Sequence, residues 1–244
     1  MMPRLTAHIL IGQRDRPNFR CQHSDAPENV DGKAAHLMKL TLSTFMSIDG
    51  VMQSPAHRTE DTRDGFTLGG WLTPFVAEDW PQWFARADAF LLGRRTFEEM
   101  SAYWPKVTDP DDVTAARLNT RPKYVVSRTL TSAEWAPTTF IAGDLRTAVE
   151  ELKAQPGDEL QMHGSGRLAR SLHDLGLIDE YRLWTFPVVL GTGLRLFSEG
   201  AIPTSMKIVD HQLTGAGVSI HTFRPAGPVI QGDHEVEDGV EVAS

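Results

Sequence analysis

The sequence predicts an α/β fold in which a mostly parallel central β-sheet is flanked by helices and ends in a C-terminal antiparallel hairpin. Short apolar runs alternate along the chain with stretches whose apolar residues recur at helical spacing. Several of these runs are unbroken, as in parallel strands that are buried on both faces. The last two β-rich runs lie close together around glycines, which is typical of a hairpin at the edge of such a sheet.

The predicted strands follow one another from residue 39 onward. The run 39–47 is rich in β-favouring residues and gives the first strand. Further apolar runs predict strands over 89–92, 123–126, 138–142, 160–163 and 181–190. The hairpin is predicted over 206–210 and 218–223, with its turn around Gly215 and Gly217.

Helices are predicted between these strands. Phe97, Met100 and Trp104 share one helical face just after Gly93. Asp144 is the expected N-cap of a helix that begins at Leu145. Two further helices are predicted, one over 78–87 and one marked by Leu168, Leu172 and Leu175.

These patterns divide the chain into three regions. Residues 1–37 show no sustained periodicity and are expected to form a flexible N-terminal extension. Residues 38–228 carry the alternating strands and helices and are expected to fold as one domain. Residues 229–244 are rich in Asp and Glu and are expected to form a flexible acidic tail.

The composition limits the possible partners. The 244 residues carry 32 Asp and Glu against 24 Lys and Arg, a formal net charge of −8, which argues against general nucleic-acid binding. No run approaches the roughly 20 apolar residues of a membrane span, so a cytoplasmic protein without membrane contact is expected. Cys21 is the only cysteine, and the histidines show no metal-binding spacing, so neither a disulfide nor a metal site is expected.

Three of the apolar runs end in turns that suit a phosphate-bearing ligand. The turns are Gly93-Arg94-Arg95-Thr96, Ser127-Arg128 and Gly164-Ser165-Gly166-Arg167. Helix N-termini offer free N–H groups and a positive dipole end, and arginines bind phosphate oxygens through paired hydrogen bonds. Each turn alone also fits an ordinary polar turn. Together they predict one polyanionic ligand at the carboxyl edge of the sheet.

Six segments occur in the order found in dihydrofolate-reductase-like proteins and cover roughly residues 38–225. They are Ser47-Ile48-Asp49-Gly50, Gly69-Gly70-Trp71, 91–98, 125–128, Gly164-Ser165-Gly166 and 187–193. The chain resembles in particular the reductase domain of bacterial riboflavin biosynthesis and its stand-alone relatives. This resemblance implies that residues 38–228 form a dihydrofolate-reductase-like domain with NADPH laid across the strand ends. It also implies a homodimer, for which the apolar run 181–190 is the expected interface.

The resemblance assigns roles to residues of this sequence. By this resemblance, the cofactor phosphates are bound by Gly93, Arg94, Arg95 and Thr96. The adenosine 2′-phosphate is bound by Ser127 and Arg128. The pyrophosphate is bound by Gly164, Ser165, Gly166, Arg167 and Leu168. The Gly164–Ser165 bond is a candidate for the cis peptide that the family often has between two glycines, with serine here in place of the second.

The pocket residues come from other segments. Asp49, directly after the first strand, is the predicted catalytic carboxylate, because it is placed to orient a ring nitrogen or sugar hydroxyl during hydride transfer. An Asp-Gly turn is the alternative interpretation of the same residue. Trp71, Asp79 and Trp83 are the predicted substrate contacts, with the indole rings as walls for a planar heterocycle.

The hypothesis is therefore an NADPH-dependent reductase of a small heterocyclic or ribosylated substrate, with 5-amino-6-(5-phosphoribosylamino)uracil of riboflavin biosynthesis as the candidate. A zinc deaminase is excluded, because that enzyme needs a Pro-Cys-x-x-Cys segment. Two alternatives stay open. One is a protein that binds a dinucleotide without turnover and acts as a sensor or assembly partner. The other is a dihydrofolate reductase, which the spacing before Trp83 does not favour.

Overall fold

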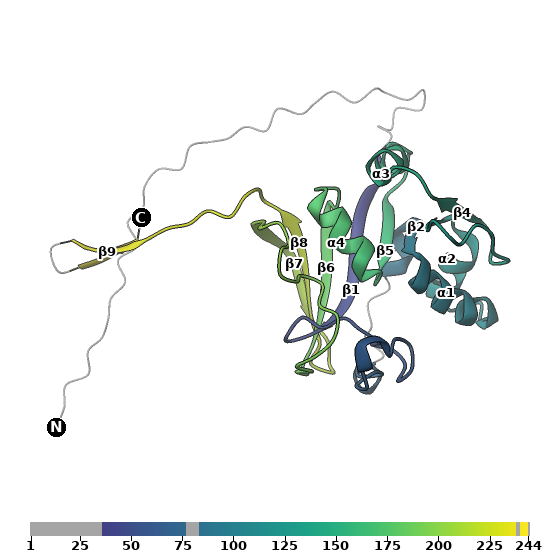
Figure 1. Ribbon diagram of the computed structural model, residues 1–244, viewed down its shortest axis with the longest axis horizontal. Coiled ribbons are helices and arrows are strands. Elements are labelled where there is room, and N and C mark those ends of the chain that lie inside the picture. Colours follow the sequence, from purple (N-terminus) through teal and green to yellow (C-terminus); the bar gives the residue numbers. More distant parts are fainter. Residues whose placement is uncertain (1–35, 77–82, 238–239, 244) are drawn as a thin grey trace. The chain divides into compact units, whose positions relative to one another are not determined.

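The computed structural model describes residues 36–76, 83–237 and 240–243 (Figure 1). The chain divides into two units, Met1–Ala35 and His36–Ser244, and the fold described here is that of the second. The predicted N-terminal extension thus lies almost wholly outside the described residues.

The central feature is an eight-stranded sheet with the order β4-β3-β2-β5-β1-β6-β8-β7. From β4 to β6 every neighbouring pair is parallel, and β8 and β7 are antiparallel additions. The strands are β1 (Lys39–Ser47), β2 (Ala87–Gly93), β3 (Lys123–Val126), β4 (Thr138–Ile141), β5 (Glu159–His163), β6 (Glu180–Phe186), β7 (Met206–Leu213) and β8 (Ser219–Pro225). The predicted mostly parallel sheet with a C-terminal antiparallel hairpin is confirmed.

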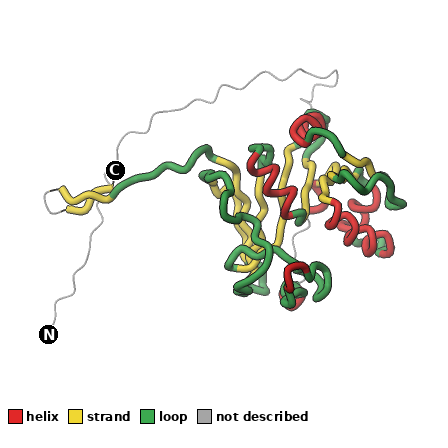
Figure 2. Tube along the Cα trace, in the orientation of Figure 1, coloured by secondary structure: helices red, strands yellow, loops and turns green. Residues whose placement is uncertain are grey.

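Four α-helices accompany the sheet in the described part of the chain (Figure 2). They are α1 (Arg94–Tyr103), α2 (Val113–Thr120), α3 (Leu145–Lys153) and α4 (Gly166–Asp174). The Asp144 side chain accepts a hydrogen bond from Thr147 N at 2.8 Å, which confirms it as the N-cap of α3. Helix α2 was not predicted from the sequence.

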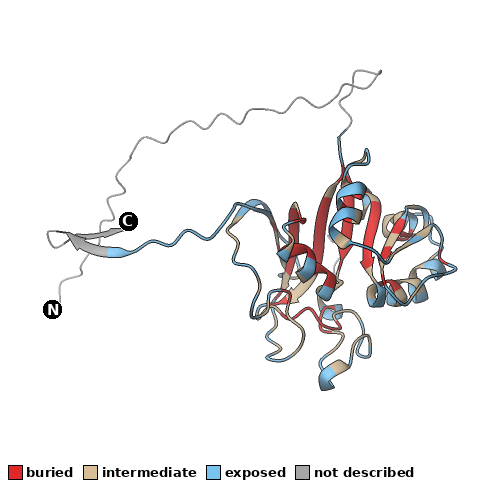
Figure 3. Cartoon of the chain, turned by 45° about the horizontal axis from the view of Figure 1, so that its top comes forward, coloured by how far each residue is buried: buried red, intermediate tan, exposed pale blue. Residues whose placement is uncertain are grey.

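Both faces of the sheet are covered, which explains the unbroken apolar strands (Figure 3). On one face Leu91 packs in a core cluster with Val149 of α3 and Leu172 of α4. On the other face Phe90 packs in a cluster that contains Phe97 of α1. The side chains of neighbouring β2 residues thus reach separate cores, as the period of two requires.

Two predicted boundaries are wrong. Of the helix predicted over 78–87, residues 78–82 lie outside the described residues, and Trp83–Arg86 is a single 3₁₀ turn. Ala87 already belongs to β2, because it is buried and pairs with Glu159 of β5. The strand predicted to run to residue 190 ends at Phe186, since Pro187 has no N–H for a sheet hydrogen bond.

The predicted acidic tail contains regular structure. Strands β9 (His234–Glu237) and β10 (Val240–Ala243) pair as an antiparallel hairpin. Its flexibility stays a prediction.

Candidate functional site

The turns after β2 and β5 touch each other at the carboxyl edge of the sheet. Gly93 N donates a hydrogen bond to Ser165 Oγ at 3.0 Å, and Ser165 N donates to Thr96 Oγ1 at 3.1 Å. A Cβ atom added at Gly93 would lie 3.5 Å from Ser165 Cβ. Two of the three predicted ligand-binding turns therefore form one continuous surface.

The turn after β3 joins them through Arg94, whose Nη1 donates to Thr129 Oγ1 at 2.7 Å. Ser127 is buried, and its Oγ accepts hydrogen bonds from Thr129 N at 3.2 Å and Leu130 N at 2.9 Å. The Ser127 hydroxyl thus shapes its own turn, while the neighbouring Arg128 is exposed.

The N-terminus of α4 has no side-chain cap. Gly164 and Ser165 both have left-handed backbone angles, with φ of 56° and 55°. Ser165 Oγ donates to His163 O at 3.1 Å and makes no capping hydrogen bond to α4. The first N–H groups of α4 therefore keep their donor capacity and the positive end of the helix dipole. The Gly164–Ser165 bond is trans, so the cis peptide implied by the resemblance is not found there.

Four arginines lie on these turns and their helices. Arg94 forms an ion pair of 2.7 Å with Glu98, and Arg95 lies 3.9 Å from Asp61. The other two, Arg128 and Arg167, are exposed and have no ion-pair partner among the described residues. Leu168, also assigned to the cofactor by the resemblance, is buried in the core beneath α4. We call the turns, the α4 N-terminus and these arginines the carboxyl-edge cradle.

Asp49 is held by hydrogen bonds on both carboxylate oxygens. Oδ1 accepts from Ser47 Oγ at 2.7 Å and from Leu190 N at 3.0 Å. Oδ2 accepts from Gly191 N at 2.9 Å and lies 3.2 Å from Arg195 Nη2. The hydrogen bond from Leu190 N, helped by those from Ser47 and Gly191, holds the pKa of this carboxyl far below its usual range. The structure thus gives Asp49 an anchoring position, and its predicted catalytic role stays a prediction.

The segment that Asp49 anchors reaches the cradle. Met52 N donates to Leu194 O at 2.8 Å, and Leu194 N donates to Gln53 Oε1 at 2.9 Å. A Cβ atom at Gly166, the first residue of α4, would lie 2.9 Å from Met52 Sδ and 3.1 Å from Leu194 Cδ2. Glycine at this position lets the helix begin directly against the anchored segment.

The predicted substrate contacts have different settings. Trp71 is buried, packs edge-on against Phe186 with ring centroids 5.4 Å apart, and donates from Nε1 to Gln53 O at 2.9 Å. This is a core position, and a substrate contact by Trp71 stays a prediction. Trp83 is partly exposed, with the Arg182 guanidinium 4.8 Å from its ring centroid. Asp79 lies outside the described residues.

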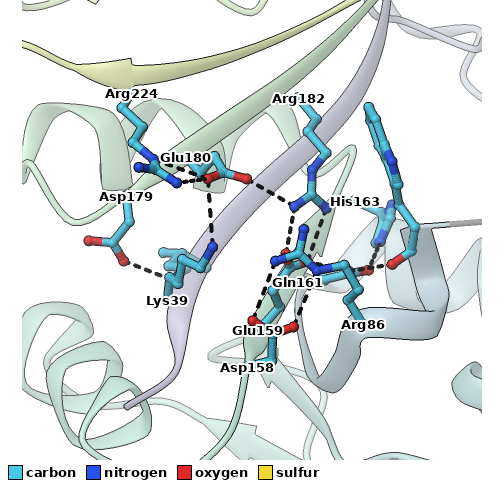
Figure 4. A network of polar contacts seen from close by, with 12 residues as sticks. Lys39, Arg86, Asp158, Glu159, Gln161, His163, Asp179, Glu180, Arg182 and Arg224 are labelled. Atoms are coloured by element: carbon cyan, nitrogen blue, oxygen red, sulfur yellow. Dashed lines mark hydrogen bonds and ion pairs between the residues drawn. The ribbon is translucent and has the colours of Figure 1, made fainter. Parts of the chain in front are cut away.

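Sequence reasoning missed a buried polar row along β5 (Figure 4). His163 Nε2 lies 3.0 Å from Gln161 Oε1, and Gln161 Nε2 donates to Glu159 Oε2 at 2.6 Å. The Phe84 ring stacks on His163 with centroids 4.2 Å apart. Burial, together with the positive charge of Arg182, lowers the pKa of His163 to about 3. The signal in the sequence was the period-two alternation of polar and apolar residues in 159–163.

Two classes of site are not found. No group of three or more His, Cys, Asp or Glu side chains suited to a metal ion occurs in the part of the chain that the structure describes. Among the same residues, no helix is both long and apolar enough to cross a membrane.

Comparisons with known proteins agree with the predicted resemblance. A family model described as the RibD C-terminal domain matches residues 38–220. The Bacillus subtilis (strain 168) protein YyaP is 31% identical over 164 residues, which are 64% of this chain and 87% of YyaP. YwjB of the same organism is 27% identical over 157 residues, which are 63% of this chain and 85% of YwjB. Both relatives are described as uncharacterized.

Solved structures share the fold. A putative riboflavin biosynthesis protein from Shewanella sp. PV-4 matches with a TM-score of 0.60 at 21% identity, covering 78% of this chain and 99% of that one. A Thermotoga maritima diaminohydroxyphosphoribosylaminopyrimidine deaminase/5-amino-6-(5-phosphoribosylamino)uracil reductase matches with a TM-score of 0.54 at 12% identity, covering 78% of this chain and 57% of that one. Because the family model runs from the start of β1 into β8, the chain belongs to the RibD C-terminal domain family.

Proposed function

We propose that the protein is an NADPH-dependent reductase that transfers a hydride to a small heterocyclic or ribosylated substrate in the cytoplasm. The observation that carries this proposal is the direct contact between the turns after β2 and β5, extended to the β3 turn by Arg94. These contacts bring three candidate phosphate-binding segments to one edge of the sheet, where ligands of parallel α/β sheets bind.

The residues present fit a dinucleotide phosphate. The uncapped N-terminus of α4, which follows the left-handed backbone at Gly164 and Ser165, offers its first N–H groups to a pyrophosphate. Arg128 and Arg167 are cations without a protein counter-ion among the described residues, and Arg128 is the proposed ligand of the 2′-phosphate that distinguishes NADPH from NADH. When bound, NADPH supplies the hydride, and the protein orients the reactants and excludes water.

The candidate substrate is 5-amino-6-(5-phosphoribosylamino)uracil. Membership in the RibD C-terminal domain family supports it, as does the reductase named in the Thermotoga maritima match. The substrate test is oxidation of NADPH, followed by its absorbance, when this pyrimidine or dihydrofolate is added. Oxidation with dihydrofolate alone would favour the folate alternative, and binding of NADPH without turnover of either would favour the sensor or assembly alternative.

The cofactor test is a calorimetric titration of the full chain with NADPH and, separately, with NADH. We expect NADPH to bind about tenfold more tightly, since one charge-assisted contact contributes on the order of 1.5–3 kcal/mol. The Arg128→Gln variant should lose this preference. Arg146→Gln, on the exposed surface of α3, is the matched control and should keep it. Equal binding of both dinucleotides to the unaltered chain would contradict the proposal.

We also propose a homodimer, but not through strand β6, which is the first part of the run 181–190. Strand β6 lies between β1 and β8, and its residues from Glu180 to Trp184 are buried, so it offers no edge to a partner, whereas Val189, later in the run, is 69% exposed. The sheet ends in two edge strands, β4 and β7, and we propose β7, which pairs only with β8 among the described strands.

A further inference from the structure

A second polar site lies at the amino edge of the sheet, where β1 and β6 begin. A cavity of about 310 Å³ is found there. Its charged lining consists of Lys39, Arg86, Arg182, Arg224, Glu180 and Asp210. Figure 4 shows most of these side chains gathered around two carboxylates, those of Glu180 and Glu159.

The Glu180 carboxylate contacts three of the four cations that line the cavity. Glu180 Oε1 accepts from Arg182 Nη2 at 2.9 Å, and Glu180 Oε2 accepts from Arg224 Nη2 at 3.1 Å. Lys39 Nζ lies 3.7 Å from the same Oε2, which is too far for a hydrogen bond. The Lys39 ammonium therefore has attraction from Glu180 without a short contact.

Arg86 stands on the other side of the cavity. Its Nε donates to Asp158 Oδ2 at 3.2 Å, and its Nη2 lies 2.9 Å from Glu159 Oε1. Arg182 also uses Glu159, through Nη1 at 3.0 Å and Nη2 at 2.6 Å. The four cations thus share three carboxylates, those of Asp158, Glu159 and Glu180, which leaves this contact set with one positive charge in excess.

The cations nearest solvent keep unused donors. Arg86 and Arg224 are 46% and 56% exposed, and each directs Nε and Nη2 at carboxylates. A guanidinium group has five N–H donors, so Nη1 of each remains available to a ligand, with no partner among the described residues. Arg182 differs, since it is 2% exposed and stacks on Trp83.

Thr41 of β1 lies near this network but not in the cavity lining. It is fully buried, and its Oγ1 has no hydrogen-bond partner among the described residues. Thr41 pairs with Gln161 on β5 and Glu180 on β6, and strand alternation puts it on the same face as Lys39. An unpaired buried hydroxyl is costly, but Thr41 does not line the cavity, so the proposal depends on the cations.

We propose that this amino-edge cavity binds a small organic oxyanion, a molecule with a phosphate or carboxylate group, between Lys39, Arg86 and Arg224. The site is separate from the carboxyl-edge cradle, because the residues of β5 from Glu159 to Gly164 lie between them, about 16 Å at the rise of a strand. The proposal goes beyond the reductase function and does not depend on it. Asp210, the one lining carboxylate outside the shared set, weakens anion binding.

The test is calorimetric titration of the full chain with inorganic phosphate and with succinate, in a buffer without other multivalent anions. These two probes distinguish a preference for phosphate from one for carboxylate. Saturable binding is expected, and Arg86→Gln and Arg224→Gln should each weaken it about tenfold, the loss of one charge-assisted contact. Asp210→Asn should tighten it. Circular dichroism checks that each variant is folded.

The controls separate the two edges of the sheet. Arg146→Gln removes a cation from α3 and should bind the anions as the unaltered chain does, whereas Arg128→Gln removes a cation from the carboxyl-edge cradle and reports any anion bound there. The proposal is overturned if no saturable binding of either anion is detected, if the Arg86 and Arg224 variants bind unchanged, or if Arg128→Gln alone abolishes binding. Titration with NADPH reports on the reductase proposal separately.

Discussion

The carboxylate of Asp49 is held in its ionised form by its hydrogen bonds, so it is poorly suited to donate a proton. Both of its oxygens accept hydrogen bonds, from Ser47, Leu190 and Gly191, and Arg195 adds an ion pair. These donors stabilise the ionised form, so proton donation at neutral pH is unfavourable. Through the 190–195 segment, the same contacts reach the start of α4. The geometry therefore favours a positioning role.

Substitution of Asp49 and Arg195, singly and together, tests this role. If Asp49 positions the cradle, Asp49→Asn and Arg195→Gln should each lower the free energy of unfolding by about 2 kcal/mol and weaken NADPH binding, and the double variant should be little worse than either. Urea denaturation and calorimetry measure both quantities. The opposite result, loss of turnover in Asp49→Asn with unchanged NADPH binding and a harmless Arg195→Gln, would show a direct catalytic role.

His163 predicts a pH dependence of stability. The folded chain binds a proton at this site only near pH 3, whereas an unfolded histidine does so near pH 6.5. Between these values the unfolded state binds more protons, so the free energy of unfolding should fall as the pH falls, by up to about 1.4 kcal/mol per pH unit. Urea denaturation from about pH 7 down to about pH 4 measures the slope.

The matched variants for this experiment are His163→Gln and His211→Gln. Removing the buried imidazole should flatten the slope, while removing the exposed imidazole of His211 should leave it as it was. An unchanged slope in His163→Gln would mean that other groups cause the acid sensitivity.

The sequence predicted the helices and strands whose capping residues or apolar patterns lie within the element itself. The helix at 145–153 has its N-cap next to its apolar face, and the strands at 39–47 and 123–126 are continuous β-favouring runs. Helix α2 was missed because it begins with the β-branched pair Val113-Thr114, although Asp112 was present as a capping signal. The boundary at Ala87 depended on pairing with Glu159, a contact over a long sequence separation.

The two candidate sites also differ in how far local sequence signals predicted them. The cradle turns were predicted, because glycine or serine, together with arginine, follows each of the three strands within a few residues. The amino-edge network was not, because Glu159, Glu180, Lys39 and Arg86 come from four separate parts of the chain. The anchoring of Asp49 depends on backbone N–H groups of Leu190 and Gly191, and no side-chain pattern reveals those donors.

The N-cap of α2 offers a test at this scale. Asp112 Oδ1 accepts from Ala115 N at 2.9 Å, so Asp112→Ala should lower the free energy of unfolding by about 1 kcal/mol. Asp112→Asn, which keeps an acceptor, should be close to the unaltered chain. Asp111→Ala, at the exposed neighbouring position, is the control. Equal stability of Asp112→Ala and Asp111→Ala in urea denaturation would show that the cap contributes nothing.

For the molecule as a whole, the parallel order of β4 to β6 gives the sheet two chemically different edges. The carboxyl edge holds turns with free N–H groups and exposed arginines. The amino edge holds a network in which buried carboxylates and cations compensate one another. The two proposed ligand sites can therefore be tested one at a time, with variants that leave the other edge untouched.

The prediction about assembly concerns β7, one of the two edge strands of the sheet. Ile208 and Leu213 of β7 are 53% and 74% exposed. Their partners on β8, Phe223 and Ser219, are four residues apart, so both pairs lie on the same face of the sheet. A long edge strand with exposed apolar side chains and unpaired backbone groups associates with another strand unless charge or cover prevents it. A second copy of this chain is the proposed partner.

Ile208→Lys and Leu213→Lys, separately and combined, should shift a dimer towards the monomer while the fold is kept, since a lysine on an edge strand is solvated in the monomer but costly in the interface. Light scattering coupled to gel filtration, over a range of protein concentrations, measures the mass. Ile48→Lys, at a residue that is 62% exposed after β1, is the matched control and should leave the mass unchanged. A monomeric unaltered chain at all concentrations, or a dimer that survives both β7 substitutions, would exclude this edge as the interface.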